Sequence, residues 1–341
     1  MKKGSILFSI ILIVAAFISG CGANHEKSSS TSSSKTKLVT LKIGYPGTGN
    51  NTASDLLAVG IDKGYFKDEL KDLVTDVQFI NFSGAGPAIN EALASKSLDI
   101  GVYGDTPGVT GKANGIDTTL IASGNSALDA AILVSPDSDI KSVKDLKGKR
   151  VATTKGSYMH KTLVQMLQAN GLSINDIQFI NMNTTDFESS LISKKIDAIV
   201  DSNVGTAKLI INKQAKVLLD CRNNPEWKGL NLVISRTQFA KDNPEVIEAL
   251  IRGFEKAKKF VAENPEETKQ IWAKSGTPKA AYDYIYPGND FGDTFNVEVN
   301  KNIIDKLNNT KTFLKDNKLI KGDFNINTWV NNTYYEKSIK K

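Results

Sequence analysis

The sequence is poor in the residues that most often carry metal ions, cross-links or nucleophilic chemistry. It has two cysteines, Cys21 and Cys221, and two histidines, His25 and His160. Because zinc sites and disulfide frameworks need clusters of these residues, we expect no metal and a fold that rests on its apolar core. The H-E-x-x-H, G-x-S-x-G, Walker A and C-x-x-C motifs are also absent. We therefore expect no catalytic residues and no cofactor, while a carboxylate-based enzyme site stays open.

Arginine and clustered positive charge are scarce as well. The four arginines are Arg150, Arg222, Arg236 and Arg252. None lies in the loops proposed below to hold a ligand, which argues against a bidentate arginine clamp on a carboxylate. The net charge of +6 is spread along the chain and is not gathered into a basic stripe with aromatic residues. We therefore expect no nucleic-acid partner.

A long apolar run occurs only at the N-terminus, over residues 6–18, and Lys2 and Lys3 precede it. A bilayer-spanning helix needs about 20 apolar residues, so this shorter run is typical of a signal peptide. The run ends in Ile18-Ser19-Gly20-Cys21, which resembles the bacterial lipobox. It predicts a signal peptide over residues 1–20 and lipidation of Cys21, with an ordinary secretory signal as the alternative.

The segment 21–37 is rich in serine and poor in apolar residues. Such a segment cannot bury enough apolar surface to fold, so it is predicted to be a flexible tether. A tether after a lipidated cysteine would hold the folded domain at the cell membrane, anchored by lipid on its extracytoplasmic face.

Beyond the tether, short apolar runs alternate with helical patterns as far as Cys221. This alternation predicts an α/β fold with largely parallel sheets. The predicted strands are Leu41–Tyr45, Val74–Asn81, Ile100–Tyr103, Thr119–Ala122, Ala131–Val134, Arg150–Thr153, Ile177–Asn181, Ala198–Val200, Val217–Leu219 and Leu232–Ser235. The predicted helices are Ser54–Gly64, Pro87–Ser95, Tyr158–Asn170, Phe187–Lys194, Thr206–Gln214, Pro244–Asn264, Glu266–Lys274, Val297–Lys315 and one from Asn327 onward.

An internal repeat links the two halves of this α/β region. Leu98-Asp99-Ile100 leads through a predicted strand to Asp105, and Ile196-Asp197-Ala198 leads through another to Asp201. In open α/β sheets, ligands bind outside the carboxyl ends of the strands. The repeat therefore predicts two related lobes with a binding cleft between them.

Five loops join the carboxyl end of a predicted strand to the start of a predicted helix, where free N–H groups and the helix dipole attract anions. They are residues 46–52, 82–87, 103–107, 154–160 and 201–205. Their amides and hydroxyls predict a site for a small organic anion. The candidate ligand-binding residues are Gly47, Thr48, Ser83, Gly84, Asp105, Thr106, Gly156, Ser157, Tyr158, His160, Asp201 and Ser202.

Several of these residues have an ordinary structural alternative. Asp105 and Asp201 would cap a helix as readily as they would contact a ligand. His160 could be a helix-surface or capping residue, and the loop 46–52 could be a plain turn. Tyr158 is predicted to pack against an apolar ligand tail.

Several stretches resemble the substrate-binding proteins of ABC importers for aliphatic sulfonates, taurine and nitrate. The resemblance extends in consistent order from Leu38 to the C-terminus. The matching stretches are Ile43-Gly44-Tyr45, Gly84-Ala85-Gly86-Pro87, Leu98-Asp99-Ile100-Gly101, Gly104-Asp105-Thr106-Pro107, residues 143–152, Lys155-Gly156-Ser157 with His160, and Gly171-Leu172.

The resemblance implies a type II periplasmic-binding-protein fold, in which two α/β lobes are joined by two crossover strands. Lobe I would comprise residues 38–128 and 237–341, and lobe II residues 129–236. The implied crossovers are Ala131–Val134 and Leu232–Ser235. The resemblance also implies a monomeric receptor that closes on its solute and delivers it to an ABC permease and its ATPase.

One departure from this family concerns the loop 201–205. Sulfonate binders commonly carry a Trp-Asp-Pro-like segment where this chain has Asp201-Ser202-Asn203, so one apolar wall of the site is missing. The resemblance favours an aliphatic sulfonate or a taurine-like solute. A thiamine-precursor or nitrate receptor, a sensory receptor, and an enzyme on the same fold remain alternatives.

Overall fold

The computed structural model describes residues 39–47 and 53–340. The predicted signal peptide, the predicted lipidation site Cys21, the predicted tether and Thr48 lie outside the described residues. Within the described part of the chain, no helix combines the length and the apolar character needed to cross a bilayer.

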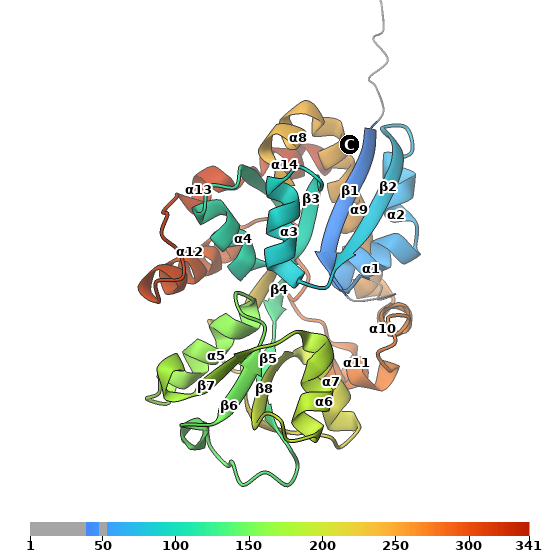
Figure 1. Ribbon diagram of the computed structural model, residues 1–341. Helices are drawn as coiled ribbons and strands as arrows, with labels where there is room; N and C mark the ends of the chain where they lie inside the picture. The colour runs from blue at the N-terminus through green and yellow to red at the C-terminus, as the bar shows by residue number, and fades with distance from the viewer. Residues whose placement is uncertain (1–38, 48–52, 341) are drawn as a thin grey trace, which may run out of the picture. The chain divides into compact units, whose positions relative to one another are not determined.

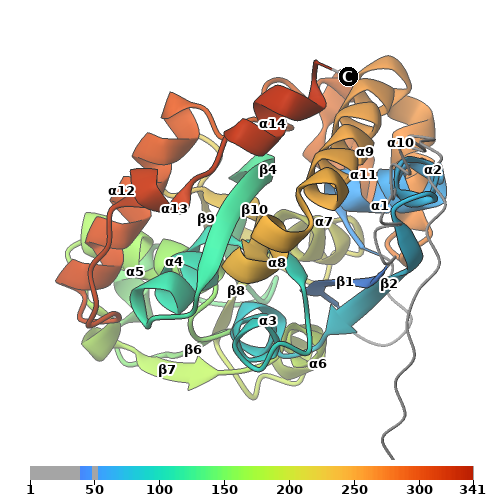
Figure 2. The same cartoon turned by 90° about the horizontal axis from the view of Figure 1, so that it is seen from above.

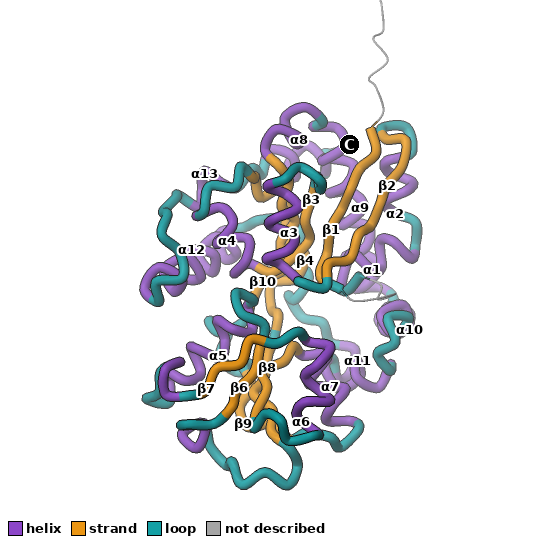
Figure 3. The backbone as a smooth tube through the Cα atoms, viewed as in Figure 1, coloured by secondary structure: helices purple, strands orange, loops and turns teal. Residues whose placement is uncertain are grey.

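Two five-stranded sheets form the framework, and every predicted strand is found in one of them (Figures 1 and 3). The first sheet has the order β2-β1-β3-β10-β4, and the second has the order β7-β6-β8-β5-β9. The first sheet contains β1 (Val39–Pro46), β2 (Val74–Phe82), β3 (Ile100–Gly104), β4 (Thr118–Leu128) and β10 (Gly229–Arg236). The second contains β5 (Ala130–Val134), β6 (Arg150–Thr153), β7 (Gln178–Asn181), β8 (Ala198–Ser202) and β9 (Lys216–Asp220).

The α/β class is confirmed, but the prediction of largely parallel sheets is wrong in part. In the first sheet β10 runs antiparallel to both β3 and β4, and in the second β5 runs antiparallel to β8 and β9. The remaining neighbours are parallel. Both antiparallel strands are buried and apolar, and such a run carries no sign of its direction.

The helices surround both sheets. Their bounds are α1 (Asp55–Asp62), α2 (Tyr65–Leu70), α3 (Ala85–Ala94), α4 (Asp105–Ala113), α5 (Tyr158–Ala169), α6 (Phe187–Ile192), α7 (Asn203–Ile211), α8 (Thr237–Asp242), α9 (Pro244–Glu263), α10 (Pro265–Ala273), α11 (Lys279–Ile285), α12 (Lys301–Asp316), α13 (Ile326–Trp329) and α14 (Thr333–Ser338). The predicted helices do not include α2, α4, α8 or α11, although the loop 103–107 is predicted to open a helix where α4 begins. The other three span only six or seven residues each, which is too short to display a helical period.

Each sheet buries an apolar core on both of its faces, as expected for α/β layers. On the first sheet, one cluster includes Ile43 and packs against α1 and α9, while the opposite cluster includes Leu232 and packs against α3, α4 and α12. Figure 2 shows α9 on one side of β4 and α12 with α13 on the other. On the second sheet, α5 covers one face and α6 and α7 cover the other.

The chain passes between the sheets at Asp129, which separates β4 from β5, and at residues 221–228, which separate β9 from β10. The expected assignment of residues 129–236 to lobe II is therefore wrong over its last eight residues, since β10 pairs with β3 and β4 of the first sheet. The implied crossover strands are likewise inner strands of single sheets. An apolar run alone does not reveal which sheet it joins.

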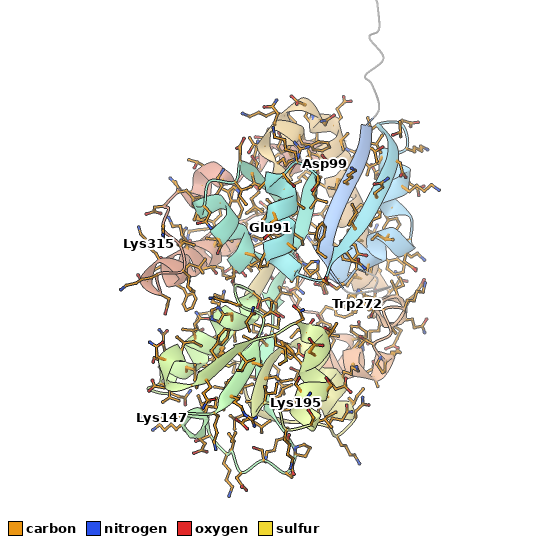
Figure 4. The ribbon with its side chains drawn as sticks, in the orientation of Figure 1. Glu91, Asp99, Lys147, Lys195, Trp272 and Lys315 are labelled. Carbon is orange, nitrogen blue, oxygen red and sulfur yellow. The ribbon has the colours of Figure 1, made fainter. Side chains whose placement is uncertain are left out.

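The repeated aspartates found in the sequence occupy equivalent places. Asp99 (labelled in Figure 4) precedes β3, accepts a hydrogen bond from the backbone N–H of Lys42 and pairs with Arg236. Asp197 precedes β8, accepts from the backbone N–H of Arg150 and pairs with the same arginine's side chain at 2.7 Å. In each sheet, the aspartate that precedes one strand bonds to the backbone of the neighbouring strand and pairs with an arginine. The two sheets therefore share the same local arrangement.

Candidate functional site

The loops predicted to bind a ligand follow β1, β2 and β3 of the first sheet and β6 and β8 of the second. Each of them precedes a helix of eight or more residues, namely α1, α3, α4, α5 and α7. The structure therefore places all the described candidates at the carboxyl ends of strands, where α/β proteins bind ligands.

Loops from the two sheets meet at Gly156. This glycine has φ +79°, and a Cβ atom built on it would lie 3.9 Å from Cγ of Pro87 in the first turn of α3. A Cβ atom on Gly104 would lie 3.8 Å from Cδ1 of Tyr158. The loops after β2, β3 and β6 therefore converge on one region between the sheets.

Ser157 and His160 organise the start of α5. The hydroxyl of Ser157 donates to the carbonyl of Thr154 at 2.7 Å and accepts from the backbone N–H of His160 at 3.3 Å, so it is the N-cap. Nδ1 of His160 accepts from the N–H of Gly156 at 3.4 Å, and its ring centroid lies 4.9 Å from that of Phe179. Burial lowers the pKa of His160 to about 4. His160 is therefore neutral at pH 7 and serves the capping role that the sequence left open.

The helix starts differ in the donors that they leave free. In α7 the first N–H groups are all used: Asn203 donates to the carbonyl of Asp129, Val204 to the Asn203 side chain, and Gly205 to Ser202. In α5 the N–H groups of Tyr158 and Met159 have no acceptor among the described residues, as is usual for the first turn of a helix. Of the two helix starts on the second sheet, only that of α5 therefore keeps free donors for an anion.

Tyr158 contacts both places where the chain passes between the sheets. Its hydroxyl donates to the carbonyl of Asp129 at 3.3 Å. Its ring lies over Gly229 at the start of β10, where a Cβ atom would come within 2.8 Å of the ring. Burial raises the pKa of Tyr158 well above its usual value. The predicted contact with an apolar ligand tail would compete with this packing.

Asp105 forms a fully buried cluster that joins three helices. Its carboxylate accepts from Nζ of Lys161 on α5 at 3.1 Å and from the hydroxyl of Thr310 on α12 at 2.6 Å. The Thr106 hydroxyl lies 3.5 Å from the same carboxylate and is buried with it. Gly104, and not Asp105, is the N-cap of α4. The carboxylate is thus engaged between α4, α5 and α12, which leaves it unavailable to a ligand.

Asp201 is the counterpart of Asp105 on the second sheet, but it has no ion pair among the described residues. Its carboxylate accepts from the backbone N–H of Ser202 at 2.7 Å, and burial raises its pKa to about 6. Ser202 is the N-cap of α7, accepting from Gly205 at 3.2 Å. A Cβ atom on Gly205 would lie 2.0 Å from the Asp201 carboxylate, so a larger residue there would displace the Asp201 side chain. Asp201 is therefore a buried, easily protonated acceptor.

The remaining candidates from the first sheet lie at the ends of β1 and β2. The backbone N–H of Gly47 donates to the carbonyl of Phe82 at 3.2 Å, which ties the two loops together. Ser83 and Gly84 are exposed, and Gly84 is the N-cap of α3. Their hydroxyl and amide groups are open to a solute.

The sequence reading missed a polar cluster around Asp55, at the start of α1. Asn125 on β4 donates to its carboxylate at 3.2 Å, and Asn231 on β10 also hydrogen-bonds to it. The indole N–H of Trp272 (labelled in Figure 4) donates to its carbonyl at 3.0 Å. Asp55 has φ +53°, and burial raises its pKa. The two asparagines interrupt otherwise apolar strand sequences, which is a signal that could have revealed the cluster.

The described residues contain no group of three or more histidine, cysteine or acidic side chains placed to hold a metal ion. Cys221 is a buried free thiol whose Sγ accepts from the N–H of Ala130 at 3.0 Å, and burial raises its pKa to about 12. It is therefore a poor nucleophile at neutral pH. The site offers hydrogen-bond donors at α3 and α5 and two protonatable carboxyls, Asp55 and Asp201.

Curated relatives are solute-binding proteins. The chain is 27% identical over all its length to a protein named as an aliphatic sulfonates-binding protein of Bacillus subtilis (strain 168), of which it covers 98%. It is 28% identical to the taurine-binding periplasmic protein of Escherichia coli (strain K12), over 68% of this chain and 75% of that protein.

Solved structures share the fold. The alkanesulfonate-binding protein of Xanthomonas axonopodis pv. citri, bound to MOPS, has a TM-score of 0.74 at 22% identity and covers 86% of this chain and 99% of its own. A desulfurization enzyme has a TM-score of 0.69 at 13% identity, over 89% of this chain and 99% of its own. These likenesses confirm the periplasmic-binding-protein fold, which supports both binding proteins and an enzyme.

The family model described as NMT1/THI5 like matches residues 51–268. The match includes the loops after β2, β3, β6 and β8 and both passages between the sheets. It covers more than half of the chain. The chain therefore belongs to the NMT1/THI5-like family.

Proposed function

We propose that this protein is the extracytoplasmic solute-binding component of an ABC importer and that it binds its solute without altering it. The solute would be a small organic anion, an aliphatic sulfonate or a taurine-like molecule, held between the two sheets. The observation that carries the proposal is the free N–H groups of Tyr158 and Met159 at the start of α5, beside the start of α3. The names of the relatives point to the same class of solute.

The available donors can account for useful affinity without an arginine. Micromolar binding requires about −8 kcal/mol. Hydrogen bonds to a charged group contribute about 1.5–3 kcal/mol each, so three to five of them suffice after the cost of association. The N–H groups of Tyr158 and Met159 and the exposed Ser83 and Gly84 could supply that number.

The two sheets with their helices would act as lobes that close on the solute, with bending at Asp129 and at residues 221–228. The closed monomer would then dock on the permease, which works with its ATPase. The carbonyl of Asp129 accepts both from Tyr158 on α5 and from the N–H of Asn203 on α7, so Asp129 would move with the second sheet.

A thermal-shift panel tests the proposal. Methanesulfonate, butanesulfonate, taurine, nitrate, sulfate and a thiamine precursor are each added to the purified protein. A solute at about 100 times its Kd stabilises the folded state by about 2.7 kcal/mol, which corresponds to a rise of about 4 °C in Tm for a domain of about 300 residues. We expect that rise with at least one sulfonate. A rise only with inorganic anions, or with none of the six, would contradict the proposal.

The same titrations at pH 7.5 and pH 5.5 give a second readout of this experiment. Because the pKa of Asp201 is raised to about 6, its carboxyl is mostly ionised at the higher pH and mostly protonated at the lower one. The sulfonate stays anionic at both. Its affinity should therefore rise several-fold at pH 5.5, and Asp201→Asn should flatten this dependence. An unchanged profile would place Asp201 away from the solute.

A nitrogen-containing solute such as a thiamine precursor is the second candidate. The observation that favours it is the pair of buried carboxyls, Asp55 and Asp201, which could accept hydrogen bonds from an amine or a protonated ring. It predicts the opposite pH dependence, since ionised carboxylates bind such a solute better. The panel at two pH values separates the two candidates.

We further propose that Cys21 carries the lipid that holds the protein at the membrane. In the native host, Cys21→Ala should move most of the protein from the membrane fraction to the medium or the soluble extract, because the tether alone has no apolar surface to bind lipid. Cys221→Ala is the matched control, since that thiol is buried inside the second sheet's core. Membrane retention of Cys21→Ala equal to that of the control would refute lipidation at this residue.

A further inference from the structure

A pocket lies beside the candidate site, between α7 and α11, which pack against each other. The space in it that no atom occupies is about 380 Å³, a figure that includes open solvent. Its lining residues are Asp129, Ala130, Ala131, Asn203, Thr206, Asp220, Arg222, Tyr284 and Ile285.

One polar group in this pocket has no partner. Thr206 is 6% exposed, and its hydroxyl has no hydrogen-bond partner among the residues that the structure describes. A buried hydroxyl without a partner costs folding free energy, and most such groups in proteins are satisfied. The hydroxyl of Thr206 is therefore available to a bound molecule.

The charged groups around the pocket are already compensated. Asp129 pairs with Lys228 at 3.0 Å, and Asp220 pairs with Arg222 at 2.7 Å. The guanidinium of Arg222 also lies 5.8 Å from the centroid of the Tyr284 ring. Since no charge is left without its partner, the pocket favours an uncharged group over an ion.

The pocket adjoins the candidate anion site through Asp129 and Asn203. The carbonyl of Asp129 accepts from Tyr158, whose own N–H is one of the free donors of α5. The same carbonyl accepts from the N–H of Asn203, and both Asp129 and Asn203 line the pocket. The two sites therefore share Asp129 as a neighbour, and a solute with its charged head at α5 would have to pass this residue to reach the pocket.

We propose that this pocket is a second, uncharged subsite of the solute site. It would accept a short alkyl chain or a small saturated ring carrying one ether oxygen, with Ala130, Ala131 and Ile285 as apolar walls and Thr206 as the hydrogen-bonding group. This proposal rests on the proposed function for the solute's charged head. Tyr284 would supply an aromatic wall in place of the one that the Asp201-Ser202-Asn203 segment lacks.

The subsite can be tested without any sulfonate. Tetrahydropyran, an uncharged ring with one oxygen, is titrated into isotopically labelled protein while the amide resonances are followed by NMR. We expect saturable shifts at Thr206 and Ile285, lost in Thr206→Leu, which fills the pocket. Thr75→Leu is the matched control, because Thr75 is exposed at the start of β2. Shifts that do not saturate, or that survive Thr206→Leu, would overturn the subsite.

A second arm compares methanesulfonate with MOPS at about pH 8.5, where the ring nitrogen of MOPS is mostly unprotonated and the ring also carries an ether oxygen. Thr206→Leu should weaken MOPS binding about tenfold or more and change methanesulfonate binding less than twofold. Thr206→Val keeps the shape but removes the hydroxyl, so it should weaken MOPS several-fold. Equal losses for both sulfonates would also overturn the subsite. If neither sulfonate binds the wild-type protein, the proposed function fails, and the tetrahydropyran arm still decides the subsite.

Discussion

A Lys161→Met variant is expected to lose about 3–5 kcal/mol of its free energy of unfolding, because removing one partner of a buried ion pair leaves the other charge unpaired. Lys161 and Asp105 have side chains that are 3% and 1% exposed, with 3.1 Å between Nζ and the carboxylate. Lys161 also donates to Thr310 and to the carbonyl of Lys228. Chemical denaturation of the purified protein measures the loss.

Lys301→Met is the matched control, since Lys301 pairs with Asp305 on an exposed face of α12. That pair should contribute less than about 1 kcal/mol. The double variant Lys161→Met/Asp105→Asn removes both charges and should recover part of the loss. A single-variant loss no larger than that of the control would contradict the role assigned to the buried pair.

The second large effect is expected on binding. Gly156→Asp places a carboxylate where α5 and α3 approach each other, next to the proposed position of the anion. At roughly 5 Å and an effective dielectric constant of about 20, two like charges repel by about 3 kcal/mol. Affinity for a sulfonate should therefore fall about 100-fold, as measured by isothermal titration calorimetry at pH 7.5.

Gly156→Asn is the control for size and backbone strain. Gly156 has φ +79°, and aspartate and asparagine both tolerate this region better than other side chains do. The asparagine variant should keep most of the affinity, because it adds the same bulk without the charge. Equal losses in the two variants would show that shape, and not charge, limits binding at this loop.

The sequence predicted the strands well because their signal is local. Each strand is a short apolar run bounded by turn residues, and every predicted run lies in a strand of the structure. Strand direction and sheet membership depend on partners far along the chain. The residues of β10 pair with Tyr103 and with Ser123, and nothing within Leu232–Ser235 specifies those partners. That is why lobe II was extended too far.

The candidate site shows the same division between local and distant information. The loops were predicted from strand ends and helix starts, which are local features. The role of Asp105 depends on Lys161 and Thr310, which lie 56 and 205 positions away. The cluster at Asp55 depends on Asn125, 70 positions away. Contacts between distant residues also decide which helix start keeps free N–H groups. In α7 the first N–H group is not free, because it donates to the carbonyl of Asp129.

The position of β10 has a consequence for how the chain acquires its structure. β10 occupies the place between β3 and β4, and its residues follow the whole of the second sheet in the sequence. During synthesis, which starts at the N-terminus, the first sheet therefore cannot be completed until residue 236 has been made. Closing contacts over such a separation is slow. Slow completion of the first sheet would leave the newly made chain unfolded for longer. An unfolded chain could still pass through a secretion channel.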